Sequence, residues 1–323
     1  MLLFLYFGGE VVDKYLITGG AGFIGSNLVE RLLMDHNQVV VVDDLSMGKY
    51  ANLATCEGQG LTFIEESLTN FTMIQELLKK EQFDYIILLG AVASVADSID
   101  RPLATHATNF EANLNILETV RQEGLRVKKI LFASSAAVYG NQPELPKKES
   151  SPIDPLTPYA IDKFASERYV IDYGKLYGLP TVAARFFNVY GPKQNPASSY
   201  SGVLSIIYDC LHCGKKFSLY GDGKQTRDFT YVADVIQAIL LLLRHDSAQP
   251  EVYNVAAGQQ TTLNECIQVM EQLTGKKLMC EYLPARVGDI QASYADISKL
   301  TALGYQPEFS IQQGLERYLA SEK

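Results

Sequence analysis

The sequence predicts an α/β fold in which a doubly wound parallel β-sheet is followed by a smaller C-terminal lobe. Two observations predict it: apolar, β-branched runs alternate with helical patterns, and a glycine-rich turn follows the first run. Apolar strands separated by helices are typical of a parallel sheet covered on both faces. The predicted strands lie in KYLIT at 14, VVVVD at 39, LTFIE at 61, YIILLG at 85, KKILFAS at 128 and TVAARFF at 181.

The glycine-rich turn, GGAGFIG, joins the first predicted strand to the helical pattern SNLVERLLM. Its spaced glycines allow a tight turn, close approach of a pyrophosphate to the backbone, and close packing of a helix whose N-terminus favours anions. Its place between strand and helix favours a dinucleotide site over a plain glycine turn. We therefore predict a Rossmann-type domain with cofactor contacts at Gly19, Gly22, Phe23, Ile24 and Gly25.

An aspartate, Asp43, ends the second predicted strand about 20 residues after this turn. Its carboxylate can accept hydrogen bonds from both hydroxyls of the adenosine ribose of NAD, and its charge repels the extra phosphate of NADP. The nearest basic residue in sequence, Lys49, could still admit that phosphate. We predict NAD as the cofactor.

Reactive side chains follow at the end of the fifth predicted strand. FASSAAVYG places Ser134 and Ser135 at the carboxyl edge of the sheet, where ligands of open α/β sheets bind. PYAIDKFASER places Tyr159 and Lys163 four residues apart, on one face of a predicted helix. A second Tyr–Lys pair at this spacing, in YGDGK, has neither a serine strand before it nor a helix. We therefore predict that Ser135, Tyr159 and Lys163 converge beside the cofactor.

After FFNVYGPKQNP the chain leaves the sheet pattern for short strands and helices with loops rich in Gly, Pro and Asn. This change is typical of a smaller lobe that closes over a cleft. We expect residues 1–187 to form mainly the NAD-binding domain and residues 188–323 mainly the substrate lobe, with the chain crossing between them.

The amino-acid composition argues against some classes of binding partner. The 323 residues are 47% apolar and 20% charged, as in ordinary globular proteins. A net charge of -9 and a pI near 5.1 argue against binding to nucleic acid or to an anionic membrane. The opening MLLFLYF is too short for a membrane span and lacks the basic start of a signal peptide.

Five scattered cysteines suit a reducing compartment, so a cytoplasmic protein is expected. Cys210 and Cys213 flank His212, but a zinc site normally needs four ligands, and no second pair follows at a suitable spacing. We predict helix packing for these residues and no metal.

Nearly the whole chain resembles the extended short-chain dehydrogenase/reductase family, and within it the NAD-dependent nucleotide-sugar epimerases that act on UDP-glucose or UDP-N-acetylglucosamine. The resemblance rests on motifs in the family's order and spacing: TGGAGFIGSNLVERL, VVDDLS, SSAAVYG, PYAIDK, RFFNVYGP, GDGKQTRDFTYVADV and RVGDIQASYADISK.

The resemblance implies that Ser135 is the active-site serine, Tyr159 the acid/base and Lys163 the activating lysine. A tyrosine with a pKa near 10 needs adjacent positive charge to act as a base at neutral pH. Lys163 and the oxidised nicotinamide would supply that charge. Tyr159, directly or through Ser135, would take the proton of a sugar hydroxyl while hydride passes to NAD. The ketosugar would then turn over and take the hydride back on its opposite face.

Binding residues follow from the same resemblance. Asn109 matches an asparagine that faces the active site, with a helix-surface asparagine as the alternative. Arg227 and Arg286 match the two phosphate-binding arginines of the family, and the forked guanidinium of arginine suits phosphate oxygens. The implied cofactor contacts outside the glycine turn are Asp43, Ser67, Asn109, Tyr159 and Lys163; the implied substrate contacts are Ser134, Ser135, Asn188, Arg227, Arg286, Asp289 and Ser293.

Ser293 bears on the substrate. Family members restricted to UDP-glucose and UDP-galactose resemble one another in a bulky tyrosine at this position. A serine leaves room for an N-acetyl group, so we predict that UDP-N-acetylglucosamine and UDP-N-acetylgalactosamine are accepted too. The alternative is that Ser293 only lines a surface loop.

Some positions depart from the family. Leu88 replaces a common histidine, Ala93 replaces a lysine of some epimerases, and Ser67 replaces an aspartate that meets the adenine, which puts these cofactor contacts in doubt. Ala136 and Ala137 stand where sugar-nucleotide dehydratases carry acidic residues, which argues against dehydration. A reductase or decarboxylase of the family, or a non-catalytic NAD-sensing protein, remains an alternative. The resemblance also implies a homodimer through the helices bearing Asn109 and Tyr159.

Overall fold

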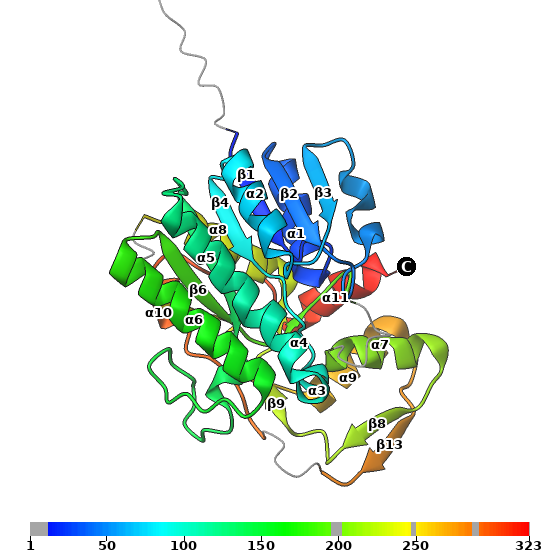
Figure 1. Cartoon of the computed structure of the whole chain (residues 1–323). Helices are drawn as coiled ribbons and strands as arrows, with labels where there is room; N and C mark the ends of the chain where they lie inside the picture. Colours follow the sequence, from blue (N-terminus) through cyan, green and yellow to red (C-terminus); the bar gives the residue numbers. More distant parts are fainter. Residues whose placement is uncertain (1–11, 195–201, 247–249, 286–290, 323) are drawn as a thin grey trace, which may run out of the picture.

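The computed structural model describes residues 12–194, 202–246, 250–285 and 291–322. A seven-stranded sheet lies at its centre in the order β11-β6-β5-β4-β1-β2-β3, and every neighbouring pair is parallel (Figure 1). The predicted α/β, doubly wound class is therefore confirmed. The strands are β1 (Lys14–Thr18), β2 (Gln38–Asp43), β3 (Leu61–Glu65), β4 (Tyr85–Leu88), β5 (Lys129–Ser135), β6 (Thr181–Phe186) and β11 (Val252–Val255).

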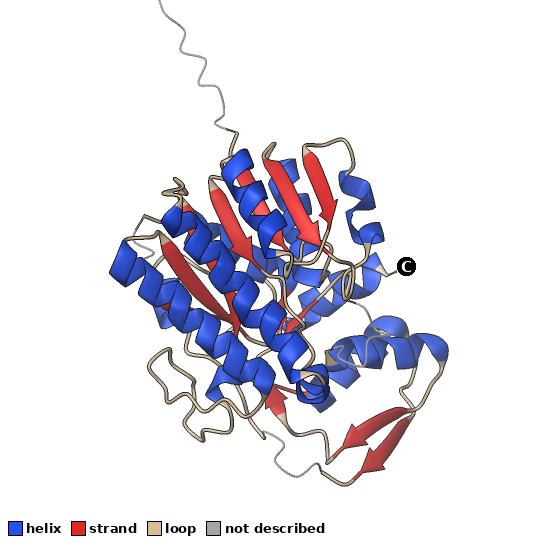
Figure 2. Ribbon diagram, viewed as in Figure 1, coloured by secondary structure: helices blue, strands red, loops and turns tan. Residues whose placement is uncertain are grey.

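Helices cover both faces of this sheet (Figure 2). On β1, Tyr15 and Ile17 enter one core and Leu16 enters the other, because successive side chains of a strand point to opposite faces. This double burial explains why the strands read as unbroken apolar runs. Helices α1 (Phe23–Met34) and α8 (Val232–Arg244) contribute to the first core, and α2 (Phe71–Glu81), α5 (Ala112–Gln122) and α6 (Pro158–Tyr177) to the second.

The chain crosses back to the sheet after residue 187. Strand β11 returns from the second half of the chain and pairs with β6, with Tyr253 opposite Ala184. Helix α8, also from the second half, packs against α1, β5 and β6. The sheet therefore includes a strand from the second half of the chain.

The smaller lobe lies beyond the carboxyl ends of the strands (Figure 1). It contains α7 (Val203–Cys213), β8 (Phe217–Tyr220), α9 (Leu263–Thr274) and β13 (Cys280–Leu283), with β8 and β13 paired in parallel. Two further short ladders form in the second half of the chain. They pair β7 (Val189–Tyr190) with β10 (Thr230–Tyr231), and β9 (Thr226–Arg227) with β12 (Thr261–Thr262).

The remaining elements are short or terminal. Helix α11 (Ile311–Ser321) packs against α9, and α10 (Ser298–Thr301) against β11. The others are η1 (Tyr50–Cys56), α3 (Val95–Asp100), α4 (Pro102–His106), the π-helical turn η2 (Ala107–Glu111) and η3 (Ala136–Tyr139). Within the described ranges, no helix is long and apolar enough to cross a membrane.

The cysteine pair of the second half lies on α7. Cys210 is buried and its thiol faces the carbonyl of Lys216, whereas Cys213 is exposed beside Asp209. In the part of the chain that the structure describes, no three His, Cys, Asp or Glu side chains are grouped to hold a metal ion.

Candidate active site

The glycine turn between β1 and α1 is shaped for close packing. Gly19 has a φ of +71°, a left-handed conformation that favours glycine, and a Cβ there would lie 2.7 Å from the Cα of Gly90. A Cβ on Gly25 would lie 2.7 Å from the Cα of Gly20, so α1 approaches the turn only because position 25 lacks a side chain. Among the described residues, no side chain caps the N-terminus of α1 at Gly22, which leaves backbone N–H groups of the first turn available to a pyrophosphate.

Asp43 lies at the carboxyl end of β2, beside this turn. Its carboxylate accepts hydrogen bonds from the backbone N–H of Ala21 at 3.0 Å and of Leu45 at 2.9 Å. Burial raises the pKa of Asp43, and those backbone donors oppose the rise. The turn and the carboxylate together fit a dinucleotide with a ribose beside β2. Phe23 and Ile24, half-buried, pack against the core at the start of α1.

Helix α6 carries Tyr159 and Lys163 to the carboxyl end of β5. The helix begins where the Thr157 hydroxyl accepts a hydrogen bond from the Ala160 N–H and Pro158 occupies the first turn, and it ends at Gly178 in the left-handed conformation. This placement fixes one face of α6 against the sheet.

The predicted reactive group is brought together there. Lys163 Nζ donates to the Ala133 carbonyl of β5 at 2.8 Å and lies 6.0 Å from the centre of the Tyr159 ring. Ser135, the last residue of β5, accepts a hydrogen bond from Ala137 N–H and also bonds Tyr159. The three side chains therefore meet on the sheet edge at which ligands of such sheets bind.

Burial sets the protonation of this group. It lowers the pKa of Lys163 to about 8, while the nearby Asp162 carboxylate opposes the change. It raises the pKa of Tyr159, and the hydrogen bond with Ser135 opposes that rise. Both shifts follow from the cost of charge in a desolvated site. Tyr159 therefore needs a nearby positive charge to lose its proton near neutral pH.

Ser134, one residue before Ser135, points elsewhere. It is 3% exposed, and its hydroxyl donates to Glu167 Oε2 at 2.6 Å. Glu167 in turn is paired with Arg185 of β6, with Nη2 and Oε1 2.6 Å apart. The structure thus gives Ser134 a buried partner instead of a free hydroxyl for substrate.

Asn109 lies in the π-helical turn η2 and is fully buried. Its side chain accepts from the Val92 N–H at 2.8 Å and donates to the Val92 carbonyl at 3.1 Å. The turn also directs the Asn109 carbonyl toward Ser166 and Asn113, which both donate to it. Its amide therefore holds the loop after β4, and the predicted contact with a cofactor stays a prediction.

The residues that differ from the family pattern lie in the sheet core or in the loops after strands. Leu88 is fully buried in β4 and belongs to the second core, and Ala93 is exposed in the following loop. Ser67 is half-buried after β3, and its hydroxyl shares a hydrogen bond of 2.8 Å with Thr69. None of these side chains brings a charge to the cofactor edge.

Backbone hydrogen bonds place Ser293 beside the strand of Arg227, and Asn188 beside Thr230. The Asn188 carbonyl accepts from the Thr230 N–H at 3.2 Å, and Ser293 N–H donates to the Thr226 carbonyl at 3.2 Å. Arg227 lies next to Thr226 on β9. Asn188 is exposed and Ser293 half-buried. Arg286 and Asp289 lie outside the described residues.

Sequence reasoning missed the aspartate that joins these loops. Asp228 is fully buried and accepts from the backbone N–H of Ala257, Gly258 and Ala295, at 2.9, 3.1 and 3.1 Å. Burial raises its pKa to about 6, and the backbone donors oppose that rise. It follows Arg227 directly, so the available signal was an acidic residue inside the apolar run DFTYV.

Comparison with known proteins follows this geometry. Residues 15–256 match the model of the NAD dependent epimerase/dehydratase family. A UDP-glucuronate 4-epimerase of Thermodesulfobacterium geofontis is 34% identical over 94% of this chain and 94% of its own length.

Two solved structures are similar over nearly their whole length. The UDP-N-acetylglucosamine 4-epimerase of Methanobrevibacter ruminantium, in complex with UDP-N-acetylmuramic acid, has a TM-score of 0.90 and 35% identity, covering 96% of this chain and 98% of its own. The UDP-glucose 4-epimerase of Thermus thermophilus, in complex with NAD, has a TM-score of 0.86 and 35% identity, covering 95% and 98%.

Proposed function

The chain belongs to the NAD dependent epimerase/dehydratase family and is an NAD-dependent nucleotide-sugar epimerase, and on that premise we propose that it inverts UDP-hexoses at C4. The proposed pairs are UDP-glucose with UDP-galactose, and UDP-N-acetylglucosamine with UDP-N-acetylgalactosamine. One observation carries the proposal: Tyr159, Lys163 and Ser135 meet at the sheet edge beside the glycine turn. A phenol there can exchange the proton of a sugar hydroxyl.

Each side chain has one task in this reaction. Tyr159 takes the proton of the C4 hydroxyl and later returns it. Because burial raises the pKa of Tyr159, this step needs a nearby positive charge, which the Lys163 ammonium and the oxidised nicotinamide would supply. Lys163 keeps its place through the Ala133 carbonyl, and Ser135 orients the phenol by a hydrogen bond. Bound NAD supplies the reversible hydride acceptor. The backbone N–H groups at the start of α1 and the Asp43 carboxylate would hold it.

Residues 1–187 would serve mainly NAD, and the 188–323 half would serve mainly the nucleotide sugar. Asn188 and Arg227 would contact the pyrophosphate of UDP, with Arg286 and Asp289 as further contacts. Ser293 would face the C2 substituent of the sugar, where its small side chain leaves room for an N-acetyl group. Its backbone bond to Thr226, next to Arg227, supports this assignment.

Proton NMR of the purified protein with UDP-glucose or with UDP-N-acetylglucosamine, without added NAD, tests the proposal. We expect both to convert to their galacto epimers, because the cofactor is regenerated and should copurify. Ser293→Tyr should lower kcat/KM for the N-acetyl pair at least tenfold and leave the hexose pair within threefold. Equal losses on both pairs would contradict the role of Ser293, and conversion of neither substrate, even with NAD supplied, would contradict the proposed reaction.

A second candidate substrate is UDP-glucuronate, because a relative of that name matches almost the whole chain. A C6 carboxylate would need a cation in the sugar site. Lys193, the first cation after Asn188, instead pairs with Glu30 at 2.6 Å and donates to the Asn52 carbonyl. Lys193 is therefore engaged elsewhere, and UDP-glucuronate in the same NMR assay distinguishes the two candidate substrates.

A second copy of the chain is the proposed partner. Large apolar side chains lie exposed on α3, α4 and α6, where Ile99, Leu103 and Tyr169 are 59%, 85% and 42% exposed. Such a stripe on helices beside the site suits a homodimer interface. The described cysteines are all unpaired, which suits the proposed cytoplasmic location.

A further inference from the structure

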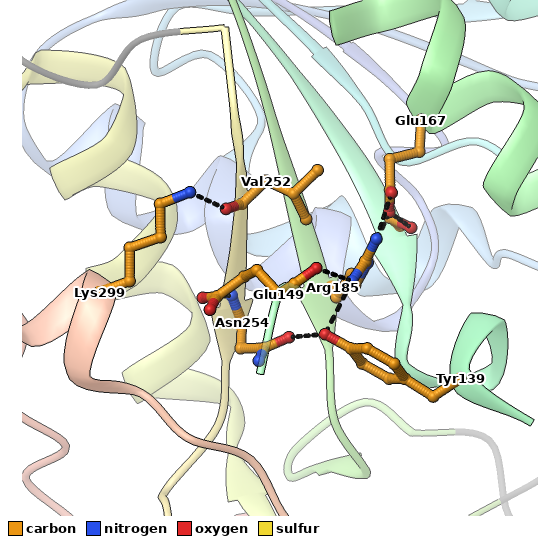
Figure 3. A network of polar contacts seen from close by, with 8 residues as sticks. Tyr139, Glu149, Glu167, Arg185, Val252, Asn254 and Lys299 are labelled. Carbon is orange, nitrogen blue, oxygen red and sulfur yellow. Dashed lines mark hydrogen bonds and ion pairs between the residues drawn. The ribbon is translucent and has the colours of Figure 1, made fainter. Parts of the chain in front are cut away.

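A buried polar network joins Glu167, Arg185, Tyr139 and Asn254, which come from α6, β6, η3 and β11 (Figure 3). Arg185 of β6 is 3% exposed and Glu167 of α6 is 1% exposed. The guanidinium donates to both carboxylate oxygens of Glu167, at 2.6 and 2.9 Å, and to the Tyr139 hydroxyl at 2.8 Å. A buried ion pair is tolerated only when its remaining donors and acceptors are satisfied, so each bond of this network constrains the others.

One end of the network holds the reactive strand. Glu167 lies one helical turn after Lys163 on α6, so both side chains face β5. Lys163 binds the Ala133 carbonyl at 2.8 Å, and Glu167 accepts from the Ser134 hydroxyl at 2.6 Å. These two bonds fix consecutive residues of β5, directly before Ser135. The ion pair with Arg185 of β6 holds the Glu167 carboxylate in that position.

The other end of the network holds the segment after Ser293. The Tyr139 hydroxyl donates to Asn254 Oδ1 at 2.7 Å. The amide of Asn254 donates to the Lys147 carbonyl at 2.9 Å and to the Asp296 carbonyl at 3.3 Å. The backbones of residues 147 and 294–296 are themselves paired, at 2.9 and 2.8 Å. Residues 294–296 are thus fastened to the sheet through Asn254.

Resting on the proposed function, we propose that this network aligns the two halves of the active site and that its two ends control different kinetic constants. Ser134 and Glu167 are positioning residues for the reactive group, because they act through β5 and Ser135. Tyr139 and Asn254 are positioning residues for the sugar, because they act through residues 293–296. The first end affects mainly kcat, and the second affects mainly KM.

Tyr139→Phe tests the sugar end, because it removes one hydroxyl and leaves the Glu167–Arg185 pair intact. A matched control is Tyr305→Phe: Tyr305 is fully buried too, and its hydroxyl donates to the Ala256 carbonyl at 3.0 Å, outside the network. We expect Tyr139→Phe to raise KM for the UDP-sugar about tenfold with kcat within twofold, as the loss of one buried hydrogen bond allows. Tyr305→Phe should leave both constants within twofold at a similar loss of melting temperature.

Ser134→Ala tests the reactive end, with Ser205→Ala as its control. Ser205 is also fully buried, and its hydroxyl donates to the Gly202 carbonyl at 2.8 Å in α7. We expect Ser134→Ala to lower kcat about tenfold with KM within twofold, and Ser205→Ala to change neither. The assignment of the two ends is overturned if each network variant behaves like its control, or if both change kcat and KM in the same ratio.

Amide hydrogen exchange supplies a readout that needs no turnover. Tyr139→Phe should increase exchange in residues 292–297, whereas Tyr305→Phe should not. If the wild-type protein converts no UDP-sugar, the proposed function fails while this comparison still tests the link. Unchanged exchange in Tyr139→Phe would overturn the link itself, whatever the activity.

Discussion

Lys163 is the residue in which stability and catalysis conflict most directly. The residue is 4% exposed, and its ammonium donates a hydrogen bond to one carbonyl of β5. Burial lowers its pKa from the ordinary 10.5 to about 8, so the folded protein binds this proton less tightly than the unfolded chain does. The protonated lysine therefore opposes folding below pH 8, by roughly 3 kcal/mol, and this opposition disappears as the pH rises from 8 to 10.5.

We expect the turnover of the enzyme with its retained NAD to fall as the pH rises above about 8. Lys163 then loses its proton, and without that charge the pKa of Tyr159, already raised by burial, rises further. Lys163→Met should lower kcat at least about 100-fold at pH 7.5. Pre-steady-state and steady-state assays between pH 6 and 10 measure both effects.

The stability of the same variant should change in the opposite direction. Urea unfolding at pH 7 should give Lys163→Met a free energy of unfolding no lower than that of the wild type, because the variant buries no charge. Between pH 8 and 10.5, the free energy of unfolding of the wild type should rise relative to that of the variant. A variant that is both inactive and strongly destabilised at pH 7 would contradict this account.

The sequence is sufficient to predict that Ser135, Tyr159 and Lys163 lie close together, but not the direction of every polar side chain. Ser135, Tyr159 and Lys163 were found from a strand end and a helical spacing, both of which are local signals. The partners of Ser134 and Asn109 lie 33 and 17 residues away in the chain, in Glu167 and Val92, so no local pattern showed that these side chains were already engaged. An arginine inside the apolar run TVAARFF was the one signal of the buried pair.

At the scale of elements, the glycine turn has two requirements, close packing of α1 and binding of the cofactor, and different glycines meet them. Gly25 provides the close contact between α1 and the turn, whereas a Cβ on Gly22 would meet only the Gly19 carbonyl, at 3.2 Å. Gly22 also has a φ of -74°, which any residue adopts. The two positions therefore distinguish packing from cofactor binding.

We expect Gly25→Ala to lower the free energy of unfolding by about 1–3 kcal/mol through overpacking. Gly22→Ala should change stability by less than about 1 kcal/mol yet reduce the NAD retained after purification, since its methyl group lies beside the free N–H groups of α1. Thermal unfolding of the NAD-free proteins and the absorbance of extracted nucleotide measure the two effects. Similar stability losses in both variants would contradict the separation.

Strand prediction depended on length and on apolar continuity. The six strands of the first half are predictable because each reads as an apolar run. Five of them bury both faces, whereas the edge strand β3 has only half-buried and exposed residues. Strand β11 has four residues, and the buried amide of Asn254 interrupts its pattern. Its place in the sheet comes from pairing with β6 and from the network around Arg185, which are contacts between distant parts of the chain.

At the scale of the molecule, the exposed apolar side chains on α3, α4 and α6 indicate where two copies would meet. Leu103→Glu places a charge at the most exposed of them, and we expect it to weaken the homodimer at least tenfold because a carboxylate is costly in an apolar interface. Met34→Glu is the control, because Met34 is 71% exposed at the end of α1, away from this stripe.

Sedimentation velocity across a concentration series measures the dimer in each variant. Unchanged melting temperature of the Leu103→Glu monomer would show that the substitution acts on association alone. A wild-type protein that is monomeric at all concentrations, or equal behaviour of the two variants, would contradict this interface.

The late position of β11 in the sequence bears on how the protein is made. Strand β6 gains its last neighbour only after residue 255 has been added, so the growing chain on the ribosome carries an open sheet edge through the synthesis of the whole intervening segment. Open strand edges invite pairing with other chains. Asn254 is added at the same stage of synthesis. Until then, the Tyr139 hydroxyl, which accepts a hydrogen bond from Arg185, lacks the Asn254 acceptor to which it donates. A chain that stops before residue 252 therefore lacks strand β11 and leaves the polar network around Arg185 incomplete. We expect chaperones and proteases to recognise such a fragment.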